Sequence, residues 1–161
     1  MTQGTFMPRH APTRQPDRKV RCPVANALDV VGDRWTLLIV RDLCAGHSRF
    51  SELCDSVEGV TTSLLSKRLK LLEQEGIVER RLYSEHPPRA EYVLTSKGHD
   101  LGVIVGALSA WGQAHAEHDL VLVDKDCGHP VRVTYQCDEC ERPAPRSRIR
   151  IVEASPHLRG G

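Results

Sequence analysis

Aromatic side chains are scarce in this chain of 161 residues, which contains two Trp, three Tyr and two Phe. So few rings argue against an aromatic platform on which the bases of a single nucleic-acid strand would stack. Long apolar runs are also missing, since none approaches the roughly 20 residues of a membrane helix. Residues 1–20 have no apolar stretch of signal-peptide type. These absences predict a cytoplasmic protein.

Motifs of the common enzyme classes are absent as well. The sequence has no glycine-rich phosphate loop, no H-E-x-x-H and no G-x-S-x-G, and its carboxylates are scattered. A thiol oxidoreductase that uses Cys137 and Cys140 is an alternative, but such a redox pair normally lies in a βαβ context that the pattern lacks. The sequence therefore predicts a protein that is not an enzyme.

The composition is that of a globular protein with one domain and an appendage, because 40% of the residues are hydrophobic and 27% are charged. The formal net charge is only +1, but the charges are unevenly distributed. Residues 1–22 and residues 142–161 each carry five basic side chains against one acidic, whereas residues 112–140 are acidic. Basic ends are compatible with an anionic partner.

Three helices are expected early in the apolar region. Pro23 suits a first helical position, and Gly32 ends that helix. Asp33 can cap a second helix, which is apolar on most sides and stops at Ala45. A third helix begins at Arg49.

A fourth helix is predicted over residues 62–75, with Thr61 or Thr62 as its cap and Gly76 at its end. Its side chains separate into two faces when they are placed at about 100° per residue. The buried face consists of Leu65, Leu69 and Leu72, and the opposite face consists of Ser63, Ser66, Lys67 and Lys70.

Two strands, over residues 77–83 and 90–95, are joined by a proline-containing tip and followed by a long helix. The apolar residues of that helix form a stripe that packs either on the core or on a second copy of the chain. They are Leu101, Ile104, Val105, Leu108 and Trp111. Helices followed by a two-stranded hairpin are the order of a winged helix-turn-helix, so the predicted fold class is mainly α with a small β-hairpin wing.

Several motifs occur in a familiar order along this region. They are Cys22-Pro23-Val24, Gly32-Asp33-Arg34-Trp35, Arg49-Phe50-Ser51-Glu52-Leu53, Leu65-Ser66-Lys67-Arg68-Leu69 and Leu94-Thr95. With these motifs, residues 22–115 closely resemble the HxlR-type family of winged helix-turn-helix transcriptional regulators, which is related to the MarR-like repressors. The resemblance implies a homodimer that binds a palindromic operator near its own or an adjacent gene, as a repressor or less often as an activator. Some members also carry a C-terminal cysteine-rich tail.

The major groove of DNA admits a rigid helix with short polar and basic side chains. The predicted DNA contacts are Thr61, Thr62, Ser63, Ser66, Lys67, Arg68, Lys70 and Arg89. The two lysines would neutralise phosphates or reach guanine edges, and prolines would stiffen the wing tip so that Arg89 reaches phosphate or the minor groove. The same stripe could instead be a solvated helix face, and Arg68 could pair with an acid such as Glu52 or Glu73.

Cys22 is the candidate redox sensor. It precedes a helix that starts at Pro23, where free amide groups and the helix dipole favour a thiolate, and nearby basic residues act in the same direction. In several members of the family a cysteine in this N-terminal position responds to electrophiles or oxidants, which implies a small-molecule or oxidant effector. Alternatively, Cys22 is a small apolar anchor for the first helix. Cys44 and Cys54 lie in apolar contexts that are typical of core packing.

The C-terminal segment carries two close pairs of soft metal ligands. Cys127-Gly128-His129 is followed, after a Val- and Tyr-containing segment that could form a hairpin, by Cys137-Asp138-Glu139-Cys140. This arrangement predicts a structural zinc site of zinc-ribbon type, with Cys127, His129, Cys137 and Cys140 as ligands. His118 or His115 could replace His129, and unligated thiols are the alternative.

These observations divide the chain into four parts. They are a disordered basic arm (1–21), a winged helix-turn-helix domain for DNA binding and dimerisation (22–118), a β-rich zinc-binding segment (119–145) and a basic tail (146–161). The predicted function is that of a sequence-specific transcriptional regulator that binds double-stranded DNA as a homodimer. The alternative from another class is a winged-helix protein-interaction module that docks through its zinc tail.

Overall fold

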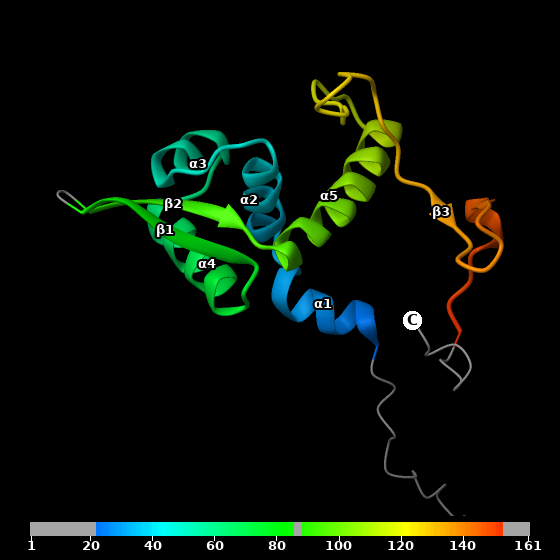
Figure 1. Cartoon of the computed structure of the whole chain (residues 1–161), viewed down its shortest axis with the longest axis horizontal. Coiled ribbons are helices and arrows are strands. Elements are labelled where there is room, and N and C mark those ends of the chain that lie inside the picture. The colour runs from blue at the N-terminus through cyan, green and yellow to red at the C-terminus, as the bar shows by residue number, and fades with distance from the viewer. Residues whose placement is uncertain (1–21, 86–87, 153–161) are drawn as a thin grey trace, which may run out of the picture.

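The computed structural model describes residues 22–85 and 88–152 (Figure 1). The predicted basic arm, residues 86–87 of the wing tip and the last residues of the basic tail lie outside the described residues. Helices, a hairpin and a long helix follow one another as the sequence predicts. The elements are α1 (Pro23–Val31), α2 (Arg34–Cys44), α3 (Phe50–Ser56), α4 (Thr62–Gln74), β1 (Val78–Glu85), β2 (Pro88–Leu94), α5 (Ser96–His115), β3 (Tyr135–Gln136), β4 (Pro143–Ala144) and a 3-10 turn (Arg146–Arg148).

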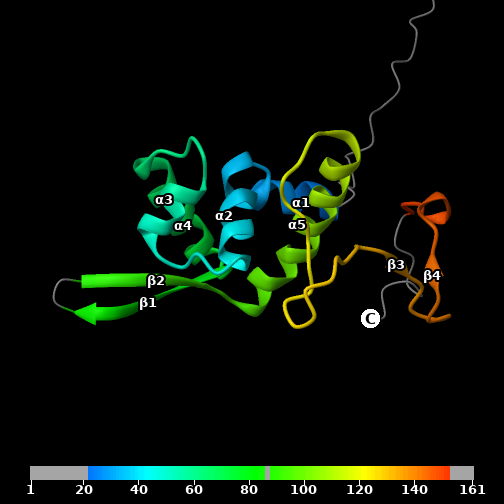
Figure 2. The same cartoon turned by 90° about the horizontal axis from the view of Figure 1, so that it is seen from above.

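The core lies where α2 meets the other helices and the base of the hairpin. α2 is central because it contacts α1, α3, α4, α5 and β2, and its Ile39 and Val40 are fully buried. Leu53 of α3 and Val78 of β1 belong to the same apolar cluster. Figure 2 shows α2, α3 and α4 grouped on one side of the hairpin, which leaves the hairpin to project from the body.

α4 begins at the predicted residue, ends one residue before the predicted end at 75, and has the orientation that its periodicity predicts. Thr61 caps it, since the Thr61 hydroxyl accepts a hydrogen bond from the backbone N–H of Leu64 at 3.2 Å. The helix stops at Gly76, whose φ of +65° lies in the left-handed region that glycine adopts without strain. The predicted buried face is confirmed, because Leu65, Leu69 and Leu72 are at most 1% exposed.

The hairpin is longer than the sequence indicates. The expected tip began at residue 84, whereas the pairing of β1 with β2 continues to Glu85 and Pro88. A register shift between Leu82 and Ser84 is a β-bulge, which twists the strands without ending their pairing. An isolated bridge between Arg49 and Glu91 also ties the segment before α3 to β2.

The first turn of α5 is fixed to the base of the hairpin. The Thr95 hydroxyl accepts a hydrogen bond from the backbone N–H of Gly98 at 3.2 Å and donates one to the carbonyl of Gly76 at 2.7 Å. Gly98 lies so close to the carbonyl of Ile77 that a Cβ there would clash with it. The start of α5 is therefore held rigidly against the domain.

The predicted apolar stripe of α5 divides into two parts. Leu101 and Val105 pack against the core, whereas Ile104, Leu108 and Trp111 are 38%, 52% and 66% exposed. Despite this stripe, no helix within the described ranges combines the length and the apolarity that crossing a membrane requires.

The tail after α5 folds back onto that helix. Side chains of Leu122 and Val133 lie over Gly106, where a Cβ would be in tight contact with both. The side-chain amide of Gln113 donates a hydrogen bond to the carbonyl of Leu120 at 3.3 Å. The tail therefore covers one side of α5, and the exposed apolar side chains lie on the rest of its surface.

Candidate nucleic-acid interface

α4 presents a polar and basic surface to solvent. Its buried leucines fix its rotation, so the predicted contact residues on the other side are all exposed: Thr61, Thr62, Ser63, Ser66, Lys67 and Lys70. Among the described residues, neither lysine forms an ion pair. The surface thus offers hydroxyl and ammonium groups that have no competing carboxylate.

Arg68 differs from the other predicted contacts. Its Nε lies 3.3 Å from the Asp33 Oδ1, and its side chain is only 31% exposed. The acid partners named from the sequence, Glu52 and Glu73, are wrong, because α4 packs on α2 near the cap of that helix. Arg68 therefore links α4 to α2 from the edge of the polar surface.

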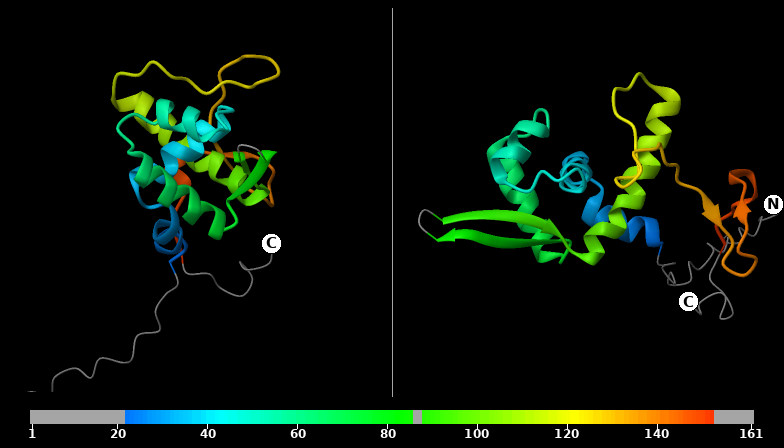
Figure 3. Two further views of the ribbon diagram at one scale, coloured as in Figure 1. Left: turned by 90° about the vertical axis from the view of Figure 1, so that its left-hand side faces the viewer. Right: turned by 45° about the horizontal axis from the view of Figure 1, so that its top comes forward.

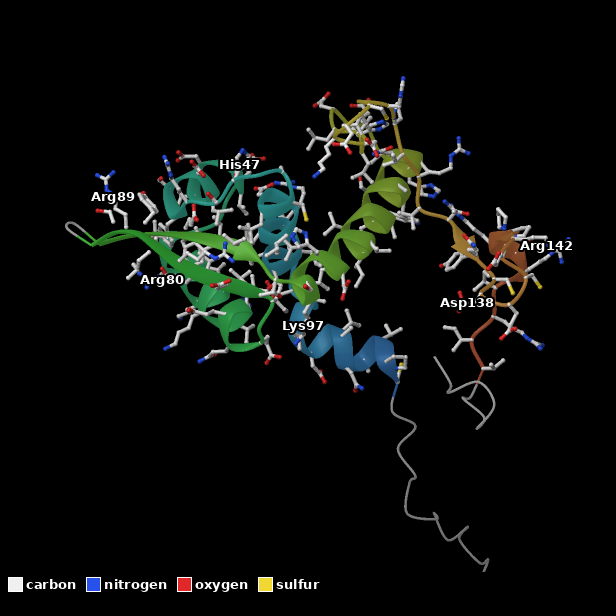
Figure 4. All side chains as sticks on the ribbon, viewed as in Figure 1. His47, Arg80, Arg89, Lys97, Asp138 and Arg142 are labelled. Atoms are coloured by element: carbon white, nitrogen blue, oxygen red, sulfur yellow. The ribbon has the colours of Figure 1, made fainter. Side chains whose placement is uncertain are left out.

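Two of the three arginines of the wing, Arg80 and Arg89, face a hollow at the end of the molecule that holds α3 and α4. Figure 4 labels Arg80 on the hairpin and Arg89 towards its tip. Both are exposed, and both line a hollow of about 570 Å³ between α3 and the hairpin. Figure 3 shows α3 lying over the hairpin with the strands extending beyond it. The hollow is also lined by Arg49, Ser51, Tyr83 and Tyr92.

Arg49, Arg80 and Tyr83 are candidate functional residues that the sequence analysis missed. In the sequence, Arg49 is distinguished only by its position at the start of a predicted helix. Arg80 lies two positions after the buried Val78 and so shares its side of the strand, which faces the helices; the period of two does contain this signal. Tyr83 is the extra residue of the bulge, and no periodicity in the sequence reveals a bulge.

Two carboxylates near the hollow are already engaged. Glu52 accepts backbone hydrogen bonds from Arg49 and Ser48, each 2.9 Å long, and these bonds lower the pKa of its carboxyl. Glu79 lies 2.8 Å from the Arg81 guanidinium, whose hydrogen bond lowers the pKa of Glu79. Neither carboxylate lines the hollow.

The N-terminal thiol and the two thiols of the helical body occupy different environments. Cys22 is exposed and stands at the N-cap of α1, where its side chain makes no capping hydrogen bond. Cys44 is exposed at the end of α2, so its expected place in the core is wrong. Cys54 is half-buried, and burial raises the pKa of its thiol, which lowers its reactivity. Burial also raises the pKa of the Cys44 thiol, so neither thiol of the helical body favours the reactive thiolate.

The tail contains two turns of the same construction, 13 residues apart. In the first, Asp124 Oδ1 accepts hydrogen bonds from the backbone N–H groups of residues 126 and 127. In the second, the Cys137 sulfur accepts from those of residues 139 and 140, which lowers the pKa of the Cys137 thiol. The residue four positions after each acceptor, Gly128 or Glu141, has a positive φ and donates to that acceptor's carbonyl, at 2.7 Å or 2.8 Å.

The two turns do not come together in the structure. The first closes on the bridge between Val123 and Pro130, and the second closes on the pairing of β3 with β4. Within residues 22–85 and 88–152, no three His, Cys, Asp or Glu side chains gather as a metal site would require. The predicted ligands Cys127 and His129 therefore lie apart from Cys137 and Cys140, because each pair belongs to its own hairpin.

Comparison with known proteins identifies relatives across most of the chain. Residues 30–120 match the model of the HxlR-like helix-turn-helix family. Rv3095 of Mycobacterium tuberculosis, named an uncharacterised HTH-type transcriptional regulator, is 36% identical over 121 residues, which cover 73% of this chain and 76% of the relative. The described fold and the sequence thus point to the same group.

Solved structures agree with this result. PA1607, described as a candidate transcription factor, superimposes with a TM-score of 0.71 at 33% identity and covers 84% of this chain and 97% of its own. The oxidised form of HypR, a redox regulator, has a TM-score of 0.55 at 35% identity and covers 62% of this chain and 100% of its own. The chain belongs to the HxlR-like helix-turn-helix family and is a winged helix-turn-helix transcriptional regulator.

Proposed function

We propose that the protein regulates transcription, as a repressor, by binding a palindromic operator as a homodimer, with α4 of each protomer in the major groove. The observation that carries this proposal is the division of α4 into a buried leucine face and an exposed face of hydroxyl and ammonium groups. Short side chains let the helix approach base edges, and Lys67 and Lys70 neutralise phosphates.

The proposal is tested by selecting binding sites for the full-length protein from a random-sequence duplex library. Selected sites should have inverted symmetry, and transcription from a promoter overlapping such a site should fall when the protein is added. The double variant Lys67→Gln/Lys70→Gln should bind about 10- to 100-fold more weakly, and Lys125→Gln, which removes a charge from the tail, should bind like the wild type. Failure of the wild type to enrich any duplex would refute DNA recognition.

Dimer formation through α1 and α5 is part of the proposal. Val24 and Leu28 of α1 are 55% and 57% exposed, and α5 leaves Leu108 and Trp111 in solvent. Figure 1 shows both helices projecting from the body on the side opposite the tip of the hairpin. Exposed large apolar side chains on neighbouring helices favour association.

Redox control through Cys22 is a further part. Its exposed position at the start of α1 supports this role, as does the similarity to HypR, which is itself described as a redox regulator. Oxidation by diamide should weaken operator binding by the wild type, whereas Cys22→Ser should be insensitive and Cys54→Ser should respond like the wild type. An equal response of Cys22→Ser to diamide would exclude this thiol as the switch.

The two turns of equal construction support zinc binding by the tail. The accepting side chain of each turn, Asp124 or Cys137, is followed three positions later by a cysteine, Cys127 or Cys140. Zinc would join the turns, because metal binding and local folding are coupled when no site is preformed. Freshly reduced protein should contain one zinc ion per chain and lose it in Cys137→Ser. Parallel variants Asp124→Asn and His129→Ala identify the fourth ligand, and zinc-free wild type would contradict the site.

A further inference from the structure

The hollow between α3 and the hairpin is unusually rich in positive charge. Arg49 precedes α3, Arg80 comes from β1, and Arg89 comes from β2, so three separate elements each contribute one guanidinium. None of the described residues that line the hollow is acidic. Three like charges around one open space repel one another, and an anion between them removes that repulsion.

The fold holds this arrangement in place. The backbone N–H of Tyr92 donates a 2.7 Å hydrogen bond to the carbonyl of Ser48, and the bridge between Arg49 and Glu91 lies beside it. The Arg49 guanidinium then stands over the ring of Tyr83, 5.4 Å from its centre, which is the geometry of a cation–π contact. Tyr83 is thus a positioning residue for Arg49.

The arginines remain available for a ligand. Arg49 Nε lies 3.8 Å from Glu52 Oε1, a long contact, and the other oxygen of that carboxylate serves two backbone N–H groups. Neither Arg80 nor Arg89 forms an ion pair with any residue whose side chain the structure describes. The neighbouring Arg81, by contrast, is paired with Glu79 and does not line the hollow.

We propose that this hollow binds the phosphodiester backbone of the DNA beside the segment that α4 reads, with Arg49 and Arg80 as its principal ligands. The planar fork of a guanidinium donates to two oxygens of one phosphate at once, whereas an ammonium group acts as a point charge. The hollow is open to solvent, and α3, which borders it, packs against α4, so a DNA strand beside α4 lies within reach of it. The inference rests on the proposed DNA binding and adds a site that α4 does not contain.

The test measures the affinity of full-length variants for a selected duplex and for a scrambled 24-base-pair duplex over a range of salt concentrations. Arg49→Gln and Arg80→Gln should each weaken binding to both duplexes about 5- to 30-fold and reduce the salt slope by about 0.9. Arg81→Gln removes the same charge one residue away and should change affinity less than about twofold. Tyr83→Leu should weaken binding, and Tyr83→Phe, which keeps the ring, should restore it.

The outcomes separate this inference from the function on which it rests. If the wild type binds DNA and Arg80→Gln binds as well as Arg81→Gln, the hollow does not bind the phosphodiester backbone. The proposed contact of α4 with DNA would stand. Wild type that binds neither duplex would overturn both. Inorganic pyrophosphate that competes at micromolar concentration, with Arg80 required, would assign the hollow to a free anion and overturn its role in DNA binding. Circular dichroism of each variant verifies that it is folded.

Discussion

Asp33 connects the cap of α2 to the position of α4. Its Oδ1 accepts hydrogen bonds from the backbone N–H groups of Trp35 and Thr36, at 3.0 Å and 3.1 Å. Its Oδ2 accepts from the hydroxyl of Thr36, which is fully buried, and Oδ1 also faces Arg68 of α4. One carboxylate therefore caps a helix, accepts from a buried hydroxyl and forms an ion pair with a half-buried cation.

Removal of this carboxylate should be costly. Asp33→Ala should lower the free energy of unfolding by about 1–3 kcal/mol, because the cap is lost and a buried hydroxyl loses its partner. Asp33→Asn keeps a capping oxygen but loses the charge that Arg68 faces. It should therefore lower the free energy of unfolding by less than Asp33→Ala does. Urea unfolding of both variants measures the difference. Equal midpoints for Asp33→Ala and wild type would contradict the dual role.

At the scale of elements, Glu52 fixes the segment that leads into α3. The carboxylate accepts from the backbone N–H groups of Ser48 and Arg49, directly before the helix, and holds the segment that bridges to β2. These hydrogen bonds lower the pKa of Glu52 in the folded protein. Glu52 therefore stabilises the fold at a pH above the pKa of the unfolded chain, and this contribution is lost as the pH falls through the lower, folded-state pKa.

This linkage predicts a pH-dependent effect of Glu52→Gln. Near neutral pH the variant should unfold at a lower urea concentration than the wild type, because an amide oxygen is a weaker acceptor than a carboxylate. Near pH 3 the difference in stability between the variant and the wild type should shrink. The Glu52 carboxyl of the wild type is then protonated to a greater extent in both the folded and the unfolded state. Glu58→Gln, at an exposed position after α3, serves as the control and should match the wild type throughout. A deficit that grows towards low pH would reverse the expected sign.

How far the sequence could predict each element depends on the range of the contacts that define it. The period of α4 and its cap are local, and so the helix, its end at Gly76 and its polar face were predictable. The hollow requires the bulge after Leu82 and the bridge from Arg49 to Glu91, a pairing across more than 40 positions, and no local pattern encodes it. The split of the α5 stripe was hidden for a similar reason, since packing on the core and coverage by the tail decide it.

At the scale of the whole molecule, the polar and basic surface of α4 lies at one end, and the exposed apolar side chains of α1 and α5 lie at the other. The hairpin, α3 and α4 occupy one end, and α1 and α5 project at the other (Figures 1 and 2). A two-fold axis near α1 and α5 would therefore leave both copies of α4 free. Residues 60–90 carry only a small excess of basic side chains, so the proposed operator should need both half-sites of the proposed homodimer for tight binding.

Disruption of the exposed apolar surface of α5 should consequently separate the protomers, and operator binding should weaken as a result. Leu108→Glu places a charge on the exposed apolar surface of that helix, where burial against a partner would desolvate it. The dimer dissociation constant, measured by sedimentation, should rise at least about 100-fold, in the range of an interface hot spot. Ile151→Glu, at a side chain 94% exposed outside α1 and α5, should remain dimeric. A Leu108→Glu protein that sediments as the wild-type dimer would show that the two-fold axis lies elsewhere, because a buried glutamate at α5 could not be tolerated.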